Sequence, residues 1–113
     1  MGSRSTRRAR TSATEASIRR DQDSEYQAAK ERLRPYEGVA RFVIMRRGEL
    51  GLTQEQLAKR MDTSHSAISR IESGQHRTSV ATLERLAQAL EVRFVIGFES
   101  GPREAPIREL ISL

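Results

Sequence analysis

The sequence predicts an all-α domain followed by one short β-strand near its C-terminus. Apolar residues between positions 39 and 90 recur at helical spacing, in segments bounded by residues that cap or end helices. Two of these segments, within LTQEQLAKRMDTSHSAISRIESG at residues 52–74, are separated by only a few polar residues. After residue 91 the apolar period falls from about 3.6 to about 2, which is the period of a strand.

The first of the two short helices is predicted to begin after Thr53 and to stop near Asp62. Thr53 and Gln56 have the spacing of a capping box, in which each side chain accepts a hydrogen bond from the backbone of the other residue. Leu57 and Met61 lie one turn apart and predict a buried face. Asp tolerates a left-handed backbone better than most residues, so it suits the end of this helix.

The second helix is predicted to begin from Thr63 or Ser64 and to end at Gly74, a residue type that favours a left-handed C-cap. Its residues divide into two stripes. The stripe predicted to pack holds Ser64, Ala67, Ile68 and Ile71, and the stripe free to contact a ligand holds Ser66, Ser69, Arg70 and Ser73.

Residues from Arg46 to Leu90 resemble the phage-repressor-like (Cro/C1, XRE) helix-turn-helix domains. The resemblance rests on the spacing of Gln54, Leu57, Ala58, Met61, Ile68, Ile71, Glu72 and Gly74. It departs at Asp62, where the family usually has glycine. It implies a five-helix lambda-repressor-like helix-turn-helix domain, here with an added N-terminal helix and a C-terminal dimerising β-strand.

In that family the second helix of the motif lies in the major groove of double-stranded DNA. The resemblance therefore implies base contacts from Ser64, His65, Ser66, Ser69 and Arg70. Arg70 is the leading residue, because a guanidinium bonds guanine O6 and N7 together, which is worth about 1 to 3 kcal/mol of discrimination. Phosphate contacts are implied for Thr53, Gln54, Gln75, His76 and Arg77. An ordinary solvated helix face is the alternative for the serines.

The same resemblance assigns Arg47 and Glu72 a structural role. They correspond to an internal arginine and glutamate that pair across two helices in some relatives. Such a pair adds little net stability but is costly to break from one side.

Composition narrows the class of protein. A chain of 113 residues has room for one domain with a modest core, and the absence of cysteine excludes disulfides and thiolate-ligated metals. His65 and His76 are predicted to face outward, which disfavours a metal site. The sequence has no glycine-rich phosphate loop, no nucleophile with a plausible base and no apolar run long enough to span a membrane. We therefore expect a protein that is not an enzyme and has no metal or cofactor. The resemblance to the phage-repressor-like domains implies that it is bacterial, cytoplasmic and nucleoid-associated.

The net charge of +5 is concentrated near the N-terminus. The first 20 residues hold six of the 20 basic and one of the 15 acidic residues, which leaves 14 of each sign in the other 93. DNA affinity must then come from local asymmetry of charge. Residues 1–21 are predicted to be a disordered basic tail, either an arm that contacts DNA phosphates or a solvated leader.

The remaining boundaries follow from breaks in the helical pattern. Residues 22–35 predict a polar N-terminal helix that ends at Pro35, and residues 36–91 predict the helix-turn-helix domain. The last helix of that domain is expected to begin after Ser79.

Residues 92–99 predict a half-buried strand, followed by a tail at residues 100–113. The strand's apolar face holds Val92, Phe94, Ile96 and Phe98. Because a single strand needs a hydrogen-bonding partner, we expect pairing with a second copy in a homodimer. The alternative is a hairpin with the terminal PIRELISL segment.

The order of a polar helix, the motif, SAISRIESG and then VRFVIGFE is similar to that of the HigA-like antitoxins of bacterial type II toxin-antitoxin modules. This resemblance implies a protein that binds and neutralises a RelE/HigB-like ribonuclease toxin and, as a dimer, represses its own operon at a palindromic operator. Tyr26, Leu33 and Tyr36 are then candidate toxin contacts, and packing of this helix on its own domain is the alternative. The alternative function is a stand-alone phage-repressor-like transcriptional regulator.

Overall fold

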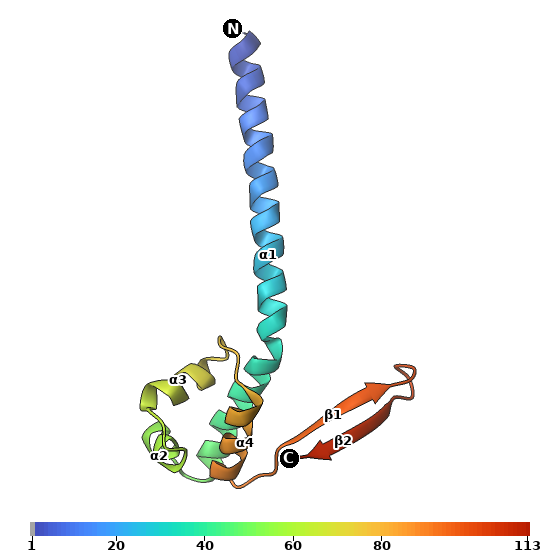
Figure 1. Cartoon of the computed structure of the whole chain (residues 1–113). Helices are drawn as coiled ribbons and strands as arrows, with labels where there is room; N and C mark the ends of the chain where they lie inside the picture. Colours follow the sequence, from blue (N-terminus) through green and yellow to red (C-terminus); the bar gives the residue numbers. More distant parts are fainter. Residues whose placement is uncertain (1) are drawn as a thin grey trace. The chain divides into compact units, whose positions relative to one another are not determined.

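The computed structural model describes the backbone of residues 2–113 and the side chains of residues 13–113. Four helices precede a two-stranded antiparallel sheet (Figure 1). The elements are α1 (Gly2–Glu49), α2 (Gln54–Arg60), α3 (His65–Ser73), α4 (Val80–Ala89), β1 (Val95–Ser100) and β2 (Ile107–Ser112). The chain divides into two compact units, one up to Arg34 and one from Pro35 to Leu113.

The helix α1 differs from the expected organisation. We expected a disordered tail over residues 1–21, a helix over 22–35 and a further helix after Pro35, whereas α1 runs through all three segments. Residues 2–113 therefore hold four helices, and the five-helix domain implied by the resemblance is not confirmed. Extending an existing helix is easier than nucleating a new one, and residues 1–21 hold six arginines, a residue type that favours helices. The side chains of Arg4, Arg7, Arg8 and Arg10 lie outside the described side chains.

The core of the Pro35–Leu113 unit is made by apolar residues from all of its helices. Val43 of α1, Leu57 of α2 and Ile68 of α3 are almost completely buried together with Leu90, which caps the end of α4. The expected core positions Leu57, Met61 and Ile68 are thus buried. No helix in the described part of the chain is both long and apolar enough to cross a membrane.

Each of the three short helices begins at a polar cap. The predicted capping box is present in α2, where Gln56 N donates to Thr53 Oγ1 at 3.1 Å and Thr53 N donates to Gln56 Oε1 at 2.8 Å. The hydroxyls of Ser64 and Ser79 accept hydrogen bonds from backbone amides in the first turns of α3 and α4. These caps satisfy amides that have no partner inside the helix.

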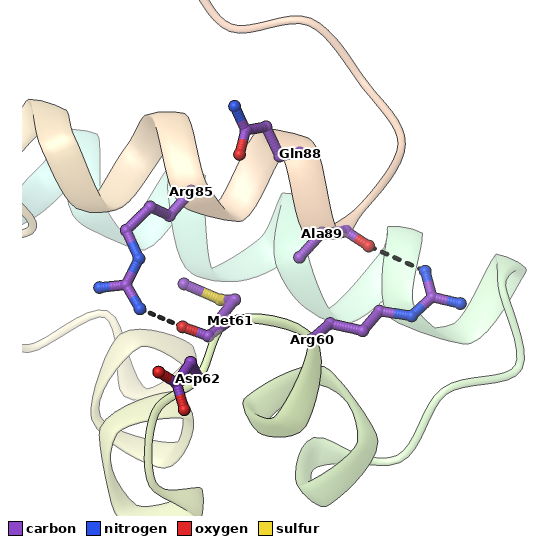
Figure 2. A pocket seen from close by; sticks show the side chains of 6 residues that line it. All are labelled: Arg60, Met61, Asp62, Arg85, Gln88 and Ala89. Atoms are coloured by element: carbon purple, nitrogen blue, oxygen red, sulfur yellow. Dashed lines mark hydrogen bonds between the residues drawn. The ribbon is translucent and has the colours of Figure 1, made fainter.

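Arginines bind the carbonyls at the ends of α2 and α4. Arg60, the last residue of α2, donates from Nη1 to Ala89 O at 2.9 Å, and Arg85 of α4 donates to Met61 O (Figure 2). Arg46 donates from Nε to Leu90 O at 2.9 Å. Cations stabilise the C-terminal ends of helices, where carbonyls lack helical partners. These three guanidiniums therefore stabilise the fold by binding carbonyls at the ends of α2 and α4.

Two positions in the helix-turn-helix adopt left-handed backbone. Asp62, which stands where glycine is usual, has a φ of 51°. Gly74 ends α3 with a φ of 68°, and a Cβ built there would lie 3.0 Å from the Cα of Glu37. Gly74 is thus required both by its backbone conformation and by the close approach of α1.

The C-terminal segment forms a hairpin, so the expectation of a single strand without an intrachain partner is wrong. β1 pairs antiparallel with β2, with Val95 opposite Ser112 and Ser100 opposite Ile107. The strand begins at Val95, whereas we expected residues 92–99, and the expected tail at 100–113 contains β2. The hairpin alternative is therefore the arrangement formed. The sequence offered this hairpin only as the alternative, because adjacent apolar residues at the end of PIRELISL blur the period of two.

Candidate nucleic-acid interface

The outward side of α3 is a polar surface on a fixed helix. Ile68 is fully buried, and Ala67 and Ile71 are half-buried. The opposite stripe is exposed, and its members are Ser66, Ser69, Arg70 and Ser73. Ser64 does not pack in the core as we expected. It is exposed, because its hydroxyl caps the helix by accepting from Ala67 N at 3.1 Å.

Arg70 differs from the arginines that bind helix ends. Its side chain is exposed, and among the described residues its guanidinium takes part in no hydrogen bond or ion pair. Its backbone carbonyl accepts from Ser73 Oγ at 2.6 Å. The five guanidinium N–H groups of Arg70 are therefore available to an external acceptor.

A bidentate ion pair lies behind this surface. Arg47 of α1 donates from Nε to Glu72 Oε2 at 3.0 Å and from Nη2 to Glu72 Oε1 at 2.9 Å. Its Nη1 also donates to Leu52 O at 2.9 Å. The Glu72 side chain is only 5% exposed, and that of Arg47 is 20% exposed. Two parallel charge-assisted bonds fix both position and angle, so the pair ties α3 to the end of α1.

Gln54, the first residue of α2, connects this ion pair to the exposed side of α3. Its Nε2 donates to Glu72 Oε1 at 3.3 Å. Its Oε1 lies 2.7 Å from His65 Nε2 and accepts from Ser69 Oγ at 3.2 Å. Sequence reasoning assigned Gln54 to phosphate and His65 and Ser69 to bases, and it missed that the three side chains meet. Helical spacing places residues on faces but does not specify which side-chain atoms touch.

The other residues assigned to phosphate lie on the surface. Thr53 is exposed, and its hydroxyl is occupied as the cap of α2. Gln75, His76 and Arg77 are exposed in the loop after α3. In this loop Gln75 N donates to Ser73 Oγ at 3.2 Å. No hydrogen bond among the described side chains joins this loop to Gln54.

The three candidate toxin contacts differ in exposure. Tyr26 is 64% exposed, whereas Leu33 and Tyr36 are half-buried. Tyr26 and Leu33 belong to the unit that ends at Arg34, and Tyr36 belongs to the unit that begins at Pro35. They do not form a single exposed cluster within one unit.

Comparisons with known proteins identify the segment that carries this site. Residues 43–96 match a family model described as helix-turn-helix. A solved structure, that of a mutant of the restriction-modification controller protein C.Esp1396I, is 32% identical in sequence, covers 50% of this chain and 72% of its own, and superposes with a TM-score of 0.48. No curated protein matches the sequence.

Proposed function

We propose that this chain, which belongs to the helix-turn-helix family through residues 43–96, is a transcriptional regulator whose helix α3 reads double-stranded DNA in the major groove. The observation that carries the proposal is the contrast on α3 between the free guanidinium of Arg70 and the side chains held behind it. Arg46, Arg60 and Arg85 are engaged by helix ends, whereas Arg70 faces solvent.

In this mechanism Arg70 bonds guanine O6 and N7, and the short side chains of Ser66 and Ser69 make weaker contacts to bases or phosphates. Thr53 and the loop at residues 75–77 contact the DNA backbone on either side of α3. The chain outside its first 20 residues has balanced charge. Few phosphates are then neutralised, so binding by the helix-turn-helix unit weakens only moderately with salt.

Selection from a randomised duplex library tests this function. We expect the full chain to enrich a defined sequence, and Arg70→Ala to bind it about 10-fold to 100-fold more weakly, since one bidentate contact is lost. Arg103→Ala is the matched control, because Arg103 is an exposed arginine in the loop between β1 and β2. Failure of the wild-type chain to enrich any sequence would contradict the proposal. Equal losses in both variants would show that only total charge matters.

We further propose that the chain acts as a homodimer joined through its hairpin, which would present two copies of α3 to a palindromic operator. Residues that lie opposite each other in the hairpin share a face. One face holds the exposed apolar side chains of Ile96, Phe98, Ile107 and Ile111. A two-stranded hairpin is marginally stable by itself, so this face favours a covering partner.

Analytical ultracentrifugation of Phe98→Glu tests the homodimer. Phe98 is 70% exposed, so the substitution leaves the helices folded and converts the dimer to a monomer. Glu99→Gln is the control on the opposite face of the same strand. A dimer that survives Phe98→Glu would contradict a role of this face.

A finer proposal, that the chain also neutralises a RelE/HigB-like toxin, rests on its resemblance to HigA-like antitoxins. The observation in its favour is the exposed aromatic ring of Tyr26 on α1, because a helix can lie in the groove of a partner. Co-expression with a RelE-like protein encoded beside this gene tests it. Rescue of growth that is lost in Tyr26→Ala supports the antitoxin, and no rescue leaves the stand-alone regulator as the function.

A further inference from the structure

We propose that Glu72 and Gln54 hold His65 in the neutral tautomer that carries its proton on Nε2, so that Nδ1 is a free acceptor for an exocyclic amino group of DNA. On the strand that His65 faces, that group is adenine N6 or cytosine N4. The inference rests on the proposed function, in which α3 enters the major groove, and it adds which bases His65 reads and why.

The first step is the orientation of the Gln54 amide. Glu72 is held by two bonds from Arg47, and an ionised carboxylate only accepts hydrogen bonds. The atom of Gln54 that lies 3.3 Å from Glu72 Oε1 must therefore be the amide nitrogen. The flipped amide would place two acceptors against each other. An assignment that distances alone leave open is thus decided by the charge of Glu72.

The second step is the tautomer of His65. With the amide nitrogen of Gln54 turned towards Glu72, its Oε1 faces α3 and accepts from Ser69 Oγ. The same oxygen lies 2.7 Å from His65 Nε2. A carbonyl oxygen has no proton to give, so Nε2 must be the donor. In a neutral imidazole one nitrogen donates and the other accepts, which leaves Nδ1 as the acceptor.

The third step is the availability of Nδ1. His65 is exposed and is the first residue of α3. Across residues 13–113, Nδ1 takes part in no hydrogen bond, whereas Nε2 is bonded to Gln54. Gln54 is therefore a positioning residue, and His65 carries the contact. The buried carboxylate of Glu72 thus orients the Gln54 amide, and that amide determines that Nδ1 of His65 is an acceptor at the surface.

An acceptor at Nδ1 distinguishes between bases, because the four bases present different donors and acceptors in the major groove. Adenine and cytosine present amino donors there, whereas guanine and thymine present only acceptors in hydrogen-bonding positions. An acceptor at Nδ1 thus favours adenine or cytosine on the strand it faces. Protonation would turn Nδ1 into a donor and reverse that preference. Arg47 and Glu55 line the same surface hollow of about 550 Å³ as His65, and the carboxylate of Glu72 reaches the ring through Gln54.

Long-range proton–nitrogen NMR of the free full-length chain tests the tautomer without DNA. At about pH 8, where an imidazole is neutral, we expect a pyrrole-like shift for Nε2 of His65 and a pyridine-like shift for Nδ1. Gln54→Ala should move both shifts towards a mixture of tautomers. The control is Gln88→Ala, an exposed glutamine of α4. A proton on Nδ1 in the wild-type chain, or shifts that do not respond to Gln54→Ala, would overturn the proposal.

Library selection at the same pH tests the bases that are read. We expect the wild-type chain to prefer adenine or cytosine at one position in each half-site, and His65→Ala to lose about tenfold of that preference while the guanine position read by Arg70 is kept. Identical sequences enriched by both proteins, or guanine at the His65 position, would overturn this inference but leave the proposed function intact. If the wild-type chain enriches nothing, the proposed function itself fails.

Discussion

Two regions of the molecule differ in whether their side chains find partners within the chain. These regions are the polar network between α2 and α3 and the β1–β2 hairpin. In the network, Glu72, Gln54 and Arg47 satisfy one another within the chain. In the hairpin the backbone is paired but the side chains of Phe98 and Ile107 remain about 70% exposed. The first region is complete without a partner, which suits the surface that we propose reads DNA. The second leaves an apolar face uncovered in the single chain, and we propose that a second copy covers it.

Removing one member of the Arg47–Glu72 ion pair should lower the free energy of unfolding more than any other change proposed for these two regions. Glu72→Ala leaves the mostly buried guanidinium of Arg47 without its carboxylate. We expect the free energy of unfolding to fall by about 3 to 5 kcal/mol, the usual cost of removing one member of a buried pair. Thermal unfolding followed by circular dichroism measures this loss.

The same variant separates a structural role of Glu72 from a DNA-binding role. Because its side chain is 5% exposed, DNA affinity of the folded fraction should fall by less than stability does. Equal losses of stability and of DNA affinity would contradict the structural role.

Gly97→Ala should break the hairpin while sparing the helices, with an intermediate effect. A Cβ at position 97 would lie 2.5 Å from Glu109 O and 2.8 Å from Leu110 Cδ2. Relieving the contact with backbone of β2 must separate the strands, at a cost of about 1 to 3 kcal/mol. We expect loss of the dimer and of amide protection in β1, measured by ultracentrifugation and hydrogen exchange.

The control for this variant is amide protection in the helices. Leu57 and Ile68 belong to a core cluster that, among the described residues, includes no residue of β1 or β2. Protection of α2 and α3 should therefore persist in Gly97→Ala. Loss of protection throughout the chain would show that the hairpin and the helices unfold as one unit.

The sequence predicted the helix-turn-helix because its signals are local. A cap depends on two residues three positions apart, and the capping box of Thr53 and Gln56 formed as the spacing indicated. Asp62 adopts the left-handed conformation for which glycine is usual, so the departure from the family pattern changed no element.

The elements that sequence reasoning missed depend on distant contacts or on competing local preferences. Pro35 predicted a helix end, but α1 continues through it. The hairpin of β1 and β2 was expected only as an alternative, because the choice between it and pairing with a second copy depends on a contact between distant residues. The meeting of Gln54 with His65 requires the angle between α2 and α3 and the rotamers of both side chains, which spacing does not contain.

The smallest change in the free energy of unfolding should come from breaking the exposed arginine–glutamate pair of the hairpin. Arg108 Nε lies 3.0 Å from Glu99 Oε1, as close as the atoms of the buried pair, but both side chains are more than half exposed. Water and salt screen such a pair, so Glu99→Gln should change the free energy of unfolding by less than about 1 kcal/mol. Chemical denaturation of this variant beside Glu72→Ala measures both. Similar losses of unfolding free energy in the two variants would show that burial does not distinguish the network from the hairpin. Burial of the Arg47–Glu72 pair could then not explain why the surface that we propose reads DNA is held rigidly.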